Sequence, residues 1–203
     1  MDQLVLDSLK KWPNVPFCYG WLALDRRGEW RMRNEFAQQN HLPGDVIKHE
    51  ALKEFIQRNF VQDQQGAFFF QNGPQRVFVT LDYTPWVARL IPNENNGWTL
   101  QTTTGQTINP IACYLDENGQ ILLESNLAYT KEIGANEFAS SPQRSVVLLH
   151  DHDLEIFSGL ASIEHNACNL TGTFDWQGIA IPIHSMMSED IAHEFSFIAK
   201  PHA

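Results

Sequence analysis

The chain has 203 residues, of which 43% are hydrophobic and 19% are charged, and its formal net charge is -10. This length allows one large domain or two small modules, and no apolar run is long enough to cross a bilayer. Acidic residues dominate after residue 60, where they would repel a phosphate backbone. Neither membrane insertion nor general nucleic-acid binding is therefore expected.

The N-terminal stretch and the cysteines indicate a cellular location. MDQLVLDSLKKW has neither the basic start nor the small-residue cleavage site of a secretory signal, so the chain is expected to be cytoplasmic. Cys18, Cys113 and Cys168 are odd in number and far apart, which predicts buried thiols and no disulfide framework. No cofactor is predicted.

Three segments have helical patterns. The first covers Asp2 to Lys11, and Pro13 closes it. The second runs from about Val46 to Phe60 with Asp45 as its N-cap, and its apolar residues recur at helical spacing: Leu52, Phe55, Ile56 and Phe60. A weaker third helix is predicted over residues 188–197.

Most of the remaining chain is typical of short strands joined by tight turns. WLALDRRGEWRMR, AFFFQNGPQRVFVTLDY and IACYLDENGQILLE each predict a β-hairpin. No glycine-rich fingerprint links a strand to a helix, which disfavours a doubly wound nucleotide-binding sheet. We therefore expect an α+β fold, mainly antiparallel hairpins with one amphipathic helix packed on the first sheet.

A short internal similarity suggests two related modules. GPQRVFVTL at 73–81 and SPQRSVVLL at 141–149 share five residue types in order. The predicted modules are 1–95, with a helix and hairpins, and 96–203, mainly β, and the boundary lies near NENNG at 93–97. One compact domain is the alternative.

The sequence HDHD, at 150–153, resembles a metal site. In a strand, His150 and His152 would share a face, but further ligands would have to come from Glu155, His165, His184 or His193, whose spacing does not guarantee convergence. Asp also favours turns, and VVLL and LEIF read as paired strands on either side. We predict a turn and no metal, with a metal-dependent enzyme using His150 and His152 as the alternative.

The first module contains the predicted ligand-binding residues. Arg31 and Arg33 share one strand face, an arrangement suited to an anion, although a solvated strand face would look the same. Aromatic residues around the second hairpin could line a pocket or simply fill a core. The predicted ligand contacts are Arg31, Arg33, Asn72, Arg76, Thr84 and Trp86.

No catalytic residue is predicted. The chain has no G-x-S-x-G elbow, and Cys18 has no assignable base. The carboxylates of DENG and SED lie in polar, turn-like contexts that would not raise their pKa, so no general-acid pair is indicated.

Two resemblances accompany these patterns. WPNVPFCYGWLALDRRGEWRMRNEFAQ, together with the QNGPQR hairpin, resembles an uncharacterised bacterial family without assigned activity, over nearly the whole chain. The order of a tryptophan hairpin, a helix and a hairpin ending at Thr84-Pro85-Trp86 is similar to another unassigned family, described as two repeated motifs and suggested to act in signalling. The second resemblance implies ligand sensing or partner binding.

The hypothesis for function is a non-catalytic protein that binds a small anionic ligand or a protein partner through its first module, with a role in regulation or signalling. The basis is a slightly basic, aromatic-rich N-terminal part, with nine Lys/Arg against eight Asp/Glu in residues 1–60. The ligand, the partner and the oligomeric state are left open by the sequence.

Overall fold

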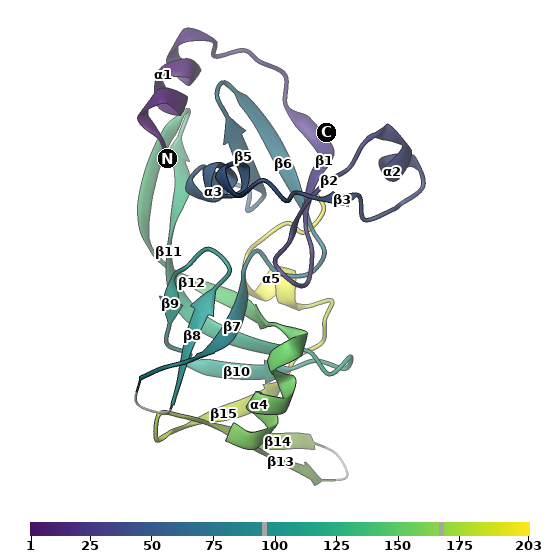
Figure 1. The fold of residues 1–203 in the computed structure, drawn as a ribbon, viewed down its shortest axis with the longest axis vertical. Helices are drawn as coiled ribbons and strands as arrows, with labels where there is room; N and C mark the ends of the chain where they lie inside the picture. The colour runs from purple at the N-terminus through teal and green to yellow at the C-terminus, as the bar shows by residue number, and fades with distance from the viewer. Residues whose placement is uncertain (95–96, 167–168) are drawn as a thin grey trace. The chain divides into compact units, whose positions relative to one another are not determined.

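The computed structural model describes residues 1–94, 97–166 and 169–203, which divide into two compact units (Figure 1). Unit 1 comprises Met1–Pro85, Ala128–Pro142 and Ser196–Ala203, and unit 2 comprises Trp86–Leu127 and Gln143–Phe195. Both are rich in strands and carry a few short helices, which confirms a broad α+β class. No helix among the described residues is long and apolar enough to cross a membrane.

Unit 1 is built on a mixed sheet. Its elements are α1 (Gln3–Lys11), β1 (Cys18–Leu24), β2 (Trp30–Met32), α2 (Glu35–Gln39), β3 (Asp45–Val46), α3 (Glu50–Arg58), β4 (Phe60–Gln62), β5 (Phe68–Asn72) and β6 (Gln75–Leu81). The strand order is β3-β2-β1-β6-β5-β4, followed by the end of β11. Because β1 pairs with β6 and β4 with β11 in parallel, the expected antiparallel hairpins are only part of a mixed sheet.

Unit 2 is also mixed. Its strands and helices are β7 (Val87–Pro92), β8 (Trp98–Thr102), β9 (Thr107–Ile108), β10 (Ala112–Leu115), β11 (Ile121–Gly134), β12 (Glu137–Leu149), η1 (Asp151–Asp153), α4 (Leu154–Leu160), β13 (Ala161–Asn166), β14 (Asn169–Trp176), β15 (Ile179–Ser185) and α5 (Ile191–Glu194). Strands β11 and β12 each contribute residues to both units. The predicted boundary at 93–97 includes residues 95 and 96, which lie outside the described residues, and the division into modules 1–95 and 96–203 stays a prediction.

Three hairpin turns share the pattern Asp-x-x-Gly, starting at Asp25, Asp63 and Asp116. In each, the carboxylate accepts hydrogen bonds of 2.7–2.9 Å from the backbone N–H groups two and four residues later. Each turn glycine has a positive φ, which a residue without a Cβ adopts at little cost. These aspartates therefore bend the backbone. Two of these turns, at Asp25 and Asp116, belong to the predicted hairpins β1–β2 and β10–β11, and the third predicted hairpin, β5–β6, is also present, so all three are confirmed.

The helices follow the predictions only in part. Helix α1 is confirmed, with Val5 and Leu9 buried. Helix α3 begins at Glu50 and not at Val46, because Asp45 and Val46 pair with β2 and the His49 side chain caps the helix by accepting from the Leu52 N–H. The third predicted helix is reduced to the four residues of α5.

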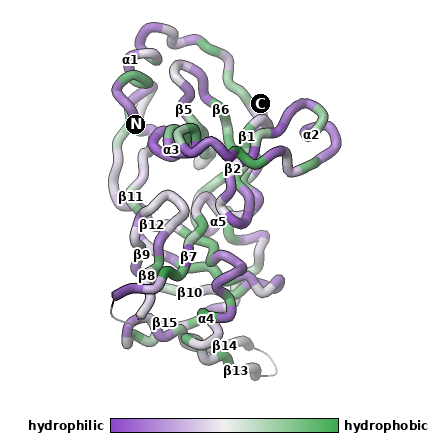
Figure 2. Tube along the Cα trace, viewed as in Figure 1, coloured by the Kyte–Doolittle hydropathy of each residue, from purple (hydrophilic) through white to green (hydrophobic). Residues whose placement is uncertain are grey.

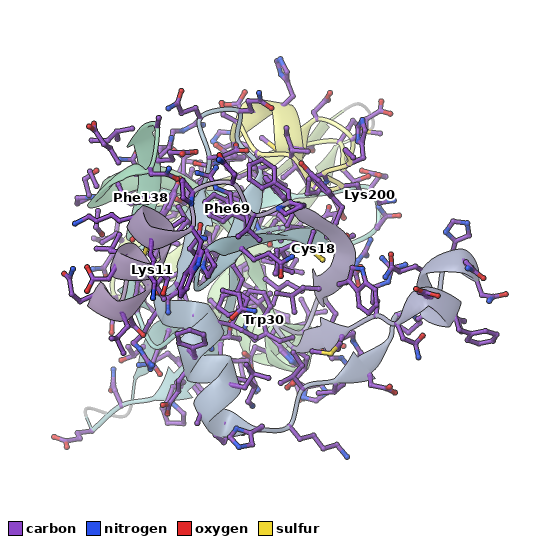
Figure 3. All side chains as sticks on the ribbon, turned by 90° about the horizontal axis from the view of Figure 1, so that it is seen from above. Lys11, Cys18, Trp30, Phe69, Phe138 and Lys200 are labelled. Atoms are coloured by element: carbon purple, nitrogen blue, oxygen red, sulfur yellow. The ribbon has the colours of Figure 1, made fainter. Side chains whose placement is uncertain are left out.

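Aromatic residues of the second hairpin fill the core of unit 1. Phe69 and Phe78 are buried with Val61 and Ala67, and Phe138 packs against this cluster (Figure 3). Of the two roles considered for these aromatic residues, a pocket lining or a packed core, the core is the one that Phe69 and Phe78 have. Figure 2 shows the corresponding pattern along the chain, in which hydrophobic stretches alternate with hydrophilic turns such as the one between β1 and β2.

The two units repeat one topology. In unit 1 a hairpin, β1–β2, is followed by a helix with a histidine cap, α3, and by a three-stranded meander, β4–β5–β6, whose last strand pairs in parallel with β1. In unit 2 the hairpin β10–β11 is followed, after β12, by η1 with the cap His150, by α4 and by the meander β13–β14–β15, whose last strand pairs in parallel with β10.

The strand registers of the two units correspond residue for residue. Phe70 faces Val77 across its hairpin as Phe174 faces Ile181. Two residues further on, Val79 pairs with Leu22 as Ile183 pairs with Cys113. The predicted similarity of 73–81 to 141–149 is not this repeat, because the topological counterpart of β6 is β15 and not β12.

Candidate anion-binding pocket

Strand β2 and the residue that follows it place the two predicted arginines on one face of the sheet. Arg31 donates from Nε to Asp25 Oδ2 at 2.6 Å and from Nη1 to the Gly44 carbonyl at 3.2 Å. Arg33 donates from Nε to the Leu42 carbonyl at 3.1 Å, and its Nη groups form no hydrogen bond within the described part of the chain. Arg31 therefore holds the adjoining loops, whereas Arg33 keeps two donor groups for a ligand.

A cavity of about 340 Å³ lies beside Arg33 in unit 1. Its lining combines cationic, anionic and apolar groups: Ala23, Arg33, His41, Leu42, Pro43, Thr80, Asp82 and Lys200. The volume is at the lower end of the range for small-molecule pockets, which starts at about 300 Å³. The cavity can therefore hold one small metabolite.

The cavity exists because small side chains meet where β1 and β6 pair. Ala23 lies opposite Thr80 in the parallel pair, so neither side chain fills the space above the sheet. The loop that forms one wall folds back at Gly44, whose φ is +80° and where a Cβ would lie 2.3 Å from the Met32 carbonyl oxygen. A larger residue at Gly44 would displace this wall.

Lys200 reaches the cavity through the C-terminal segment. Ile198 forms a parallel bridge with Ala67, and the Ala199 carbonyl accepts from the Leu81 N–H at 2.8 Å. These contacts place the segment beside the end of β6, with the Lys200 side chain at the cavity. Lys200 has no ion-pair partner among the residues that the structure describes.

Asp82 supplies the negative charge. Burial raises the pKa of its carboxyl, the nearby Asp25 raises it further, and the arginines at 26, 31 and 33 act in the opposite direction. Neither Arg33 nor Lys200 comes close enough to Asp82 for an ion pair in the described structure. The cavity therefore carries separated charges of both signs.

The repeat shows what unit 2 has at the same positions. Matching the turns at Asp25 and Asp116 makes Tyr114 the counterpart of Ala23, Glu124 the counterpart of Arg33 and His184 the counterpart of Thr80. Tyr114 therefore supplies an aromatic side chain where unit 1 has a methyl group.

Hydrogen bonds hold Tyr114 in this position. Its hydroxyl donates to Glu124 Oε2 at 2.7 Å, and Glu124 also accepts two hydrogen bonds from Arg144. Burial and the neighbouring Glu124 raise the pKa of the Tyr114 phenol to about 12, so it stays protonated as a donor. Unit 2 therefore has a tyrosine–glutamate–arginine network at the position that corresponds to the cavity of unit 1.

Of the predicted ligand residues only Arg33 lines this cavity, and Arg31 and the four others do not. Arg76 makes a two-pronged ion pair with Glu132, at 2.9 and 2.5 Å, and both side chains are about nine-tenths buried. Asn72 is exposed at the end of β5, and Thr84 and Trp86 are buried. A ligand-binding role for these four residues stays a prediction.

His41, Asp82 and Lys200 line the cavity but were not predicted from the sequence. Only Lys200 had a usable signal, since the apolar Phe197 and Ile198 before it are typical of a C-terminal segment that docks on the protein. His41 and Asp82 lie in loops whose positions depend on pairings far along the chain.

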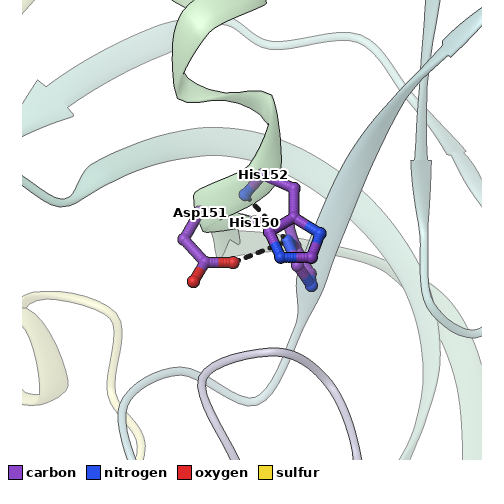
Figure 4. A group of neighbouring side chains, drawn as sticks. All are labelled: His150, Asp151 and His152. Carbon is purple, nitrogen blue, oxygen red and sulfur yellow. Dashed lines mark hydrogen bonds and ion pairs between the residues drawn. The ribbon is translucent and has the colours of Figure 1, made fainter.

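The HDHD segment is a turn, although it leads into a helix and not into a second strand. His150 Nδ1 accepts from the His152 N–H at 3.1 Å (Figure 4). Asp153 binds Arg89 and accepts from the Leu90 N–H. Leu154 and Phe157 have helical spacing, which explains why LEIF forms α4. The expected pair of strands around the turn is wrong.

Potential ligand atoms of His150, Asp151 and His152 nevertheless lie within 4.8 Å of one another. His150 Nδ1 lies 2.9 Å from Asp151 Oδ1 and already serves as a cap, as His49 Nδ1 does in unit 1. A metal bound through His150 Nδ1 would have to displace these contacts.

The two described cysteines are free thiols, and the prediction that they are buried holds for Cys113 only. Cys113 is buried, and burial raises the pKa of its thiol to about 12. Cys18 is half-buried, and burial also raises its pKa. Cys168 lies outside the described residues.

Comparison with known proteins identifies a family but no activity. No curated protein matches the chain. A solved structure of a DUF1285 family protein from Silicibacter pomeroyi DSS-3 is 15% identical over 84% of each chain, with a TM-score of 0.44. The model of a family described as "Protein of unknown function (DUF2946)" matches residues 1–202, so the chain belongs to this family and the predicted resemblance to an uncharacterised family is confirmed.

Proposed function

We propose that this protein binds a small anionic ligand in the cavity of unit 1 and acts through binding rather than catalysis. The observation that carries the proposal is the convergence of Arg33 and Lys200 on a cavity whose floor is Ala23. Arginine Nη groups and a lysine ammonium supply charge-assisted hydrogen bonds to carboxylate or phosphate oxygens. The corresponding position in unit 2 holds a tyrosine instead.

Binding is tested with the full chain by titration calorimetry and by thermal shift, using acetate, L-alanine and inorganic phosphate as separate probes. Arg33→Gln and Lys200→Gln should each weaken binding of a bound probe by about tenfold or more, because each removes a hydrogen bond to a charged group. Arg27→Gln and Lys48→Gln are matched controls, since both are exposed, lie outside the cavity and lose the same charge.

A second pair of variants tests the cavity itself. Ala23→Tyr places in unit 1 the side chain that unit 2 has at this register, so it should fill the cavity and abolish binding. Ala23→Ser nearly conserves the volume and should retain binding. The proposal is refuted if all three probes fail to bind the wild type, or if Arg33→Gln and Lys200→Gln bind as well as their controls.

A metal-dependent activity is the second candidate, favoured only by the proximity of His150, Asp151 and His152. Elemental analysis of untagged protein, followed by zinc titration of wild type and His152→Ala, tests it. The exposed His152 ring is not the helix cap, so this variant should lose a bound metal without losing the turn. Stoichiometric zinc that His152→Ala fails to bind would favour the metal site.

A further inference from the structure

The cavity of unit 1 contains opposite charges that do not neutralise each other. Asp82 lies in the same lining as Arg33 and Lys200, yet it forms no ion pair with either of them in the described structure. Asp82 and Lys200 are both exposed, so water solvates them when no ligand is bound, and each stays available for pairing with a ligand. A ligand with one group of each sign would pair with both.

We infer that the ligand is a zwitterion, an α-amino acid or a closely related ammonium carboxylate; this rests on the proposed function of the same cavity. Its carboxylate would accept hydrogen bonds from the Nη groups of Arg33 and from Lys200 Nζ, and its ammonium group would donate to Asp82. Each charged group of the lining is then paired with an opposite charge of the ligand.

A phosphate or a dicarboxylate matches the lining less well. Either would bring two negative charges to a cavity in which Asp82 already contributes one, and like charges at close range repel. The remaining wall is also informative, because Ala23, Leu42 and Pro43 are apolar and suit a small aliphatic side chain. With about 340 Å³, the cavity favours a single amino acid over a longer peptide.

The test compares ligands that carry one or both charges. L-Alanine and L-leucine are titrated beside propionate, which keeps only the carboxylate, and propylamine, which keeps only the ammonium group. We expect at least one of the two amino acids to bind about tenfold or more tightly than propionate and propylamine, since it alone makes both charge-assisted contacts.

Asp82→Asn separates this inference from the proposed function. The variant should weaken amino-acid binding about tenfold or more and leave propionate binding unchanged or tighter, because it removes the group that pairs with the ammonium. Arg33→Gln should weaken both ligands. Glu35→Gln, at an exposed position outside the cavity, controls for the change of net charge.

The outcomes are distinct. If propionate or phosphate binds as tightly as both amino acids, and Asp82→Asn does not weaken them, the ligand is a simple anion and the zwitterion is refuted while the proposed function stands. If no carboxylate or phosphate binds at all, both are refuted. If the circular dichroism of Asp82→Asn shows that it fails to fold, Asp82→Glu replaces it, because its longer side chain displaces the carboxylate. An Asp82→Glu variant that prefers amino acids over propionate as strongly as the wild type does contradicts the inference.

Discussion

The ion pair between Arg76 and Glu132 provides a test of whether Arg76 belongs to the structure or to a ligand site. The side chains are 11% and 9% exposed, and two hydrogen bonds join them. The Arg76 guanidinium also lies over the rings of Phe69 and Phe17, at 4.8 and 5.3 Å. Arg76→Met keeps much of the aliphatic length but leaves the Glu132 carboxylate buried without its cation.

The magnitude follows from these contacts. Removing one partner of a buried pair costs about 3 to 5 kcal/mol, and the residual exposure places this pair near the lower end. Loss of the cation–π contacts adds about 0.5 to 1 kcal/mol. We therefore expect Arg76→Met to lower the free energy of unfolding of unit 1 by about 3 to 4 kcal/mol, whereas Arg76→Met/Glu132→Met should lie within about 1 kcal/mol of wild type.

The assay is urea unfolding of wild type, both single variants and the double variant, followed by fluorescence and by hydrogen exchange of β6 peptides. A coupling free energy of about 2 kcal/mol or more between the two sites supports the structural role. Additive effects of the two substitutions would refute it. Ligand binding by the double variant then tests whether Arg76 contacts the ligand. If Arg76 is only structural, the double variant should bind the ligand with the affinity of the wild type.

Three further predictions concern turns and caps. Burial and the nearby Arg89 lower the pKa of His150, so the folded state binds fewer protons than the unfolded state. Stability should therefore fall as the pH drops from about 6.5 to the folded pKa. His150→Asn should keep the cap of η1 and make the melting temperature less dependent on pH in this range. Burial alone would raise the pKa of Asp153, but Arg89 and the Leu90 N–H lower it on balance, so its stabilisation is present above about pH 4 and lost as the pH falls through the folded pKa. Asp153→Asn should cost about 2 to 3 kcal/mol in urea unfolding at pH 7 and reduce the acid sensitivity. Gly44→Ala should cost at least about 1 kcal/mol and weaken ligand binding, and an unchanged melt would contradict the close approach at this loop.

The hairpins could be read from the sequence because their signals are local. Asp25-Arg26-Arg27-Gly28 contains both the carboxylate that accepts the turn hydrogen bonds and the glycine that adopts positive φ. The start of α3 and the existence of α4 could not be read as well. Asp45 resembles an N-cap until its pairing with Met32 is known, and LEIF has few enough residues to fit a strand or a helix.

The candidate site was predicted only to the extent that it depends on one strand. The sequence pattern of β2 predicted Arg31 and Arg33 on one face, and in the structure the two arginines bind different partners, Asp25 and the Leu42 carbonyl. The sequence pattern could not show which hydrogen bonds each arginine makes within the protein, because Asp25 lies in a turn and Leu42 in a loop. Lys200 joins the site through a contact with β6 that spans more than a hundred residues of sequence, and such contacts have no local pattern.

The side chains at corresponding positions of the two units support a ligand-binding role for the cavity of unit 1. The cavity opens to the surface, where five of its lining residues are exposed, and a small side chain at its base forfeits the dispersion contacts that a larger one would make. This topology can accommodate a large residue at the position of Ala23, since unit 2 holds Tyr114 at the same register and satisfies its hydroxyl with Glu124. In unit 1 the small residue coincides with a change from glutamate to Arg33 and with a lysine brought in from the C-terminal segment. An open pocket that combines a small residue at its base with two cationic side chains is what a site for a small anionic group requires.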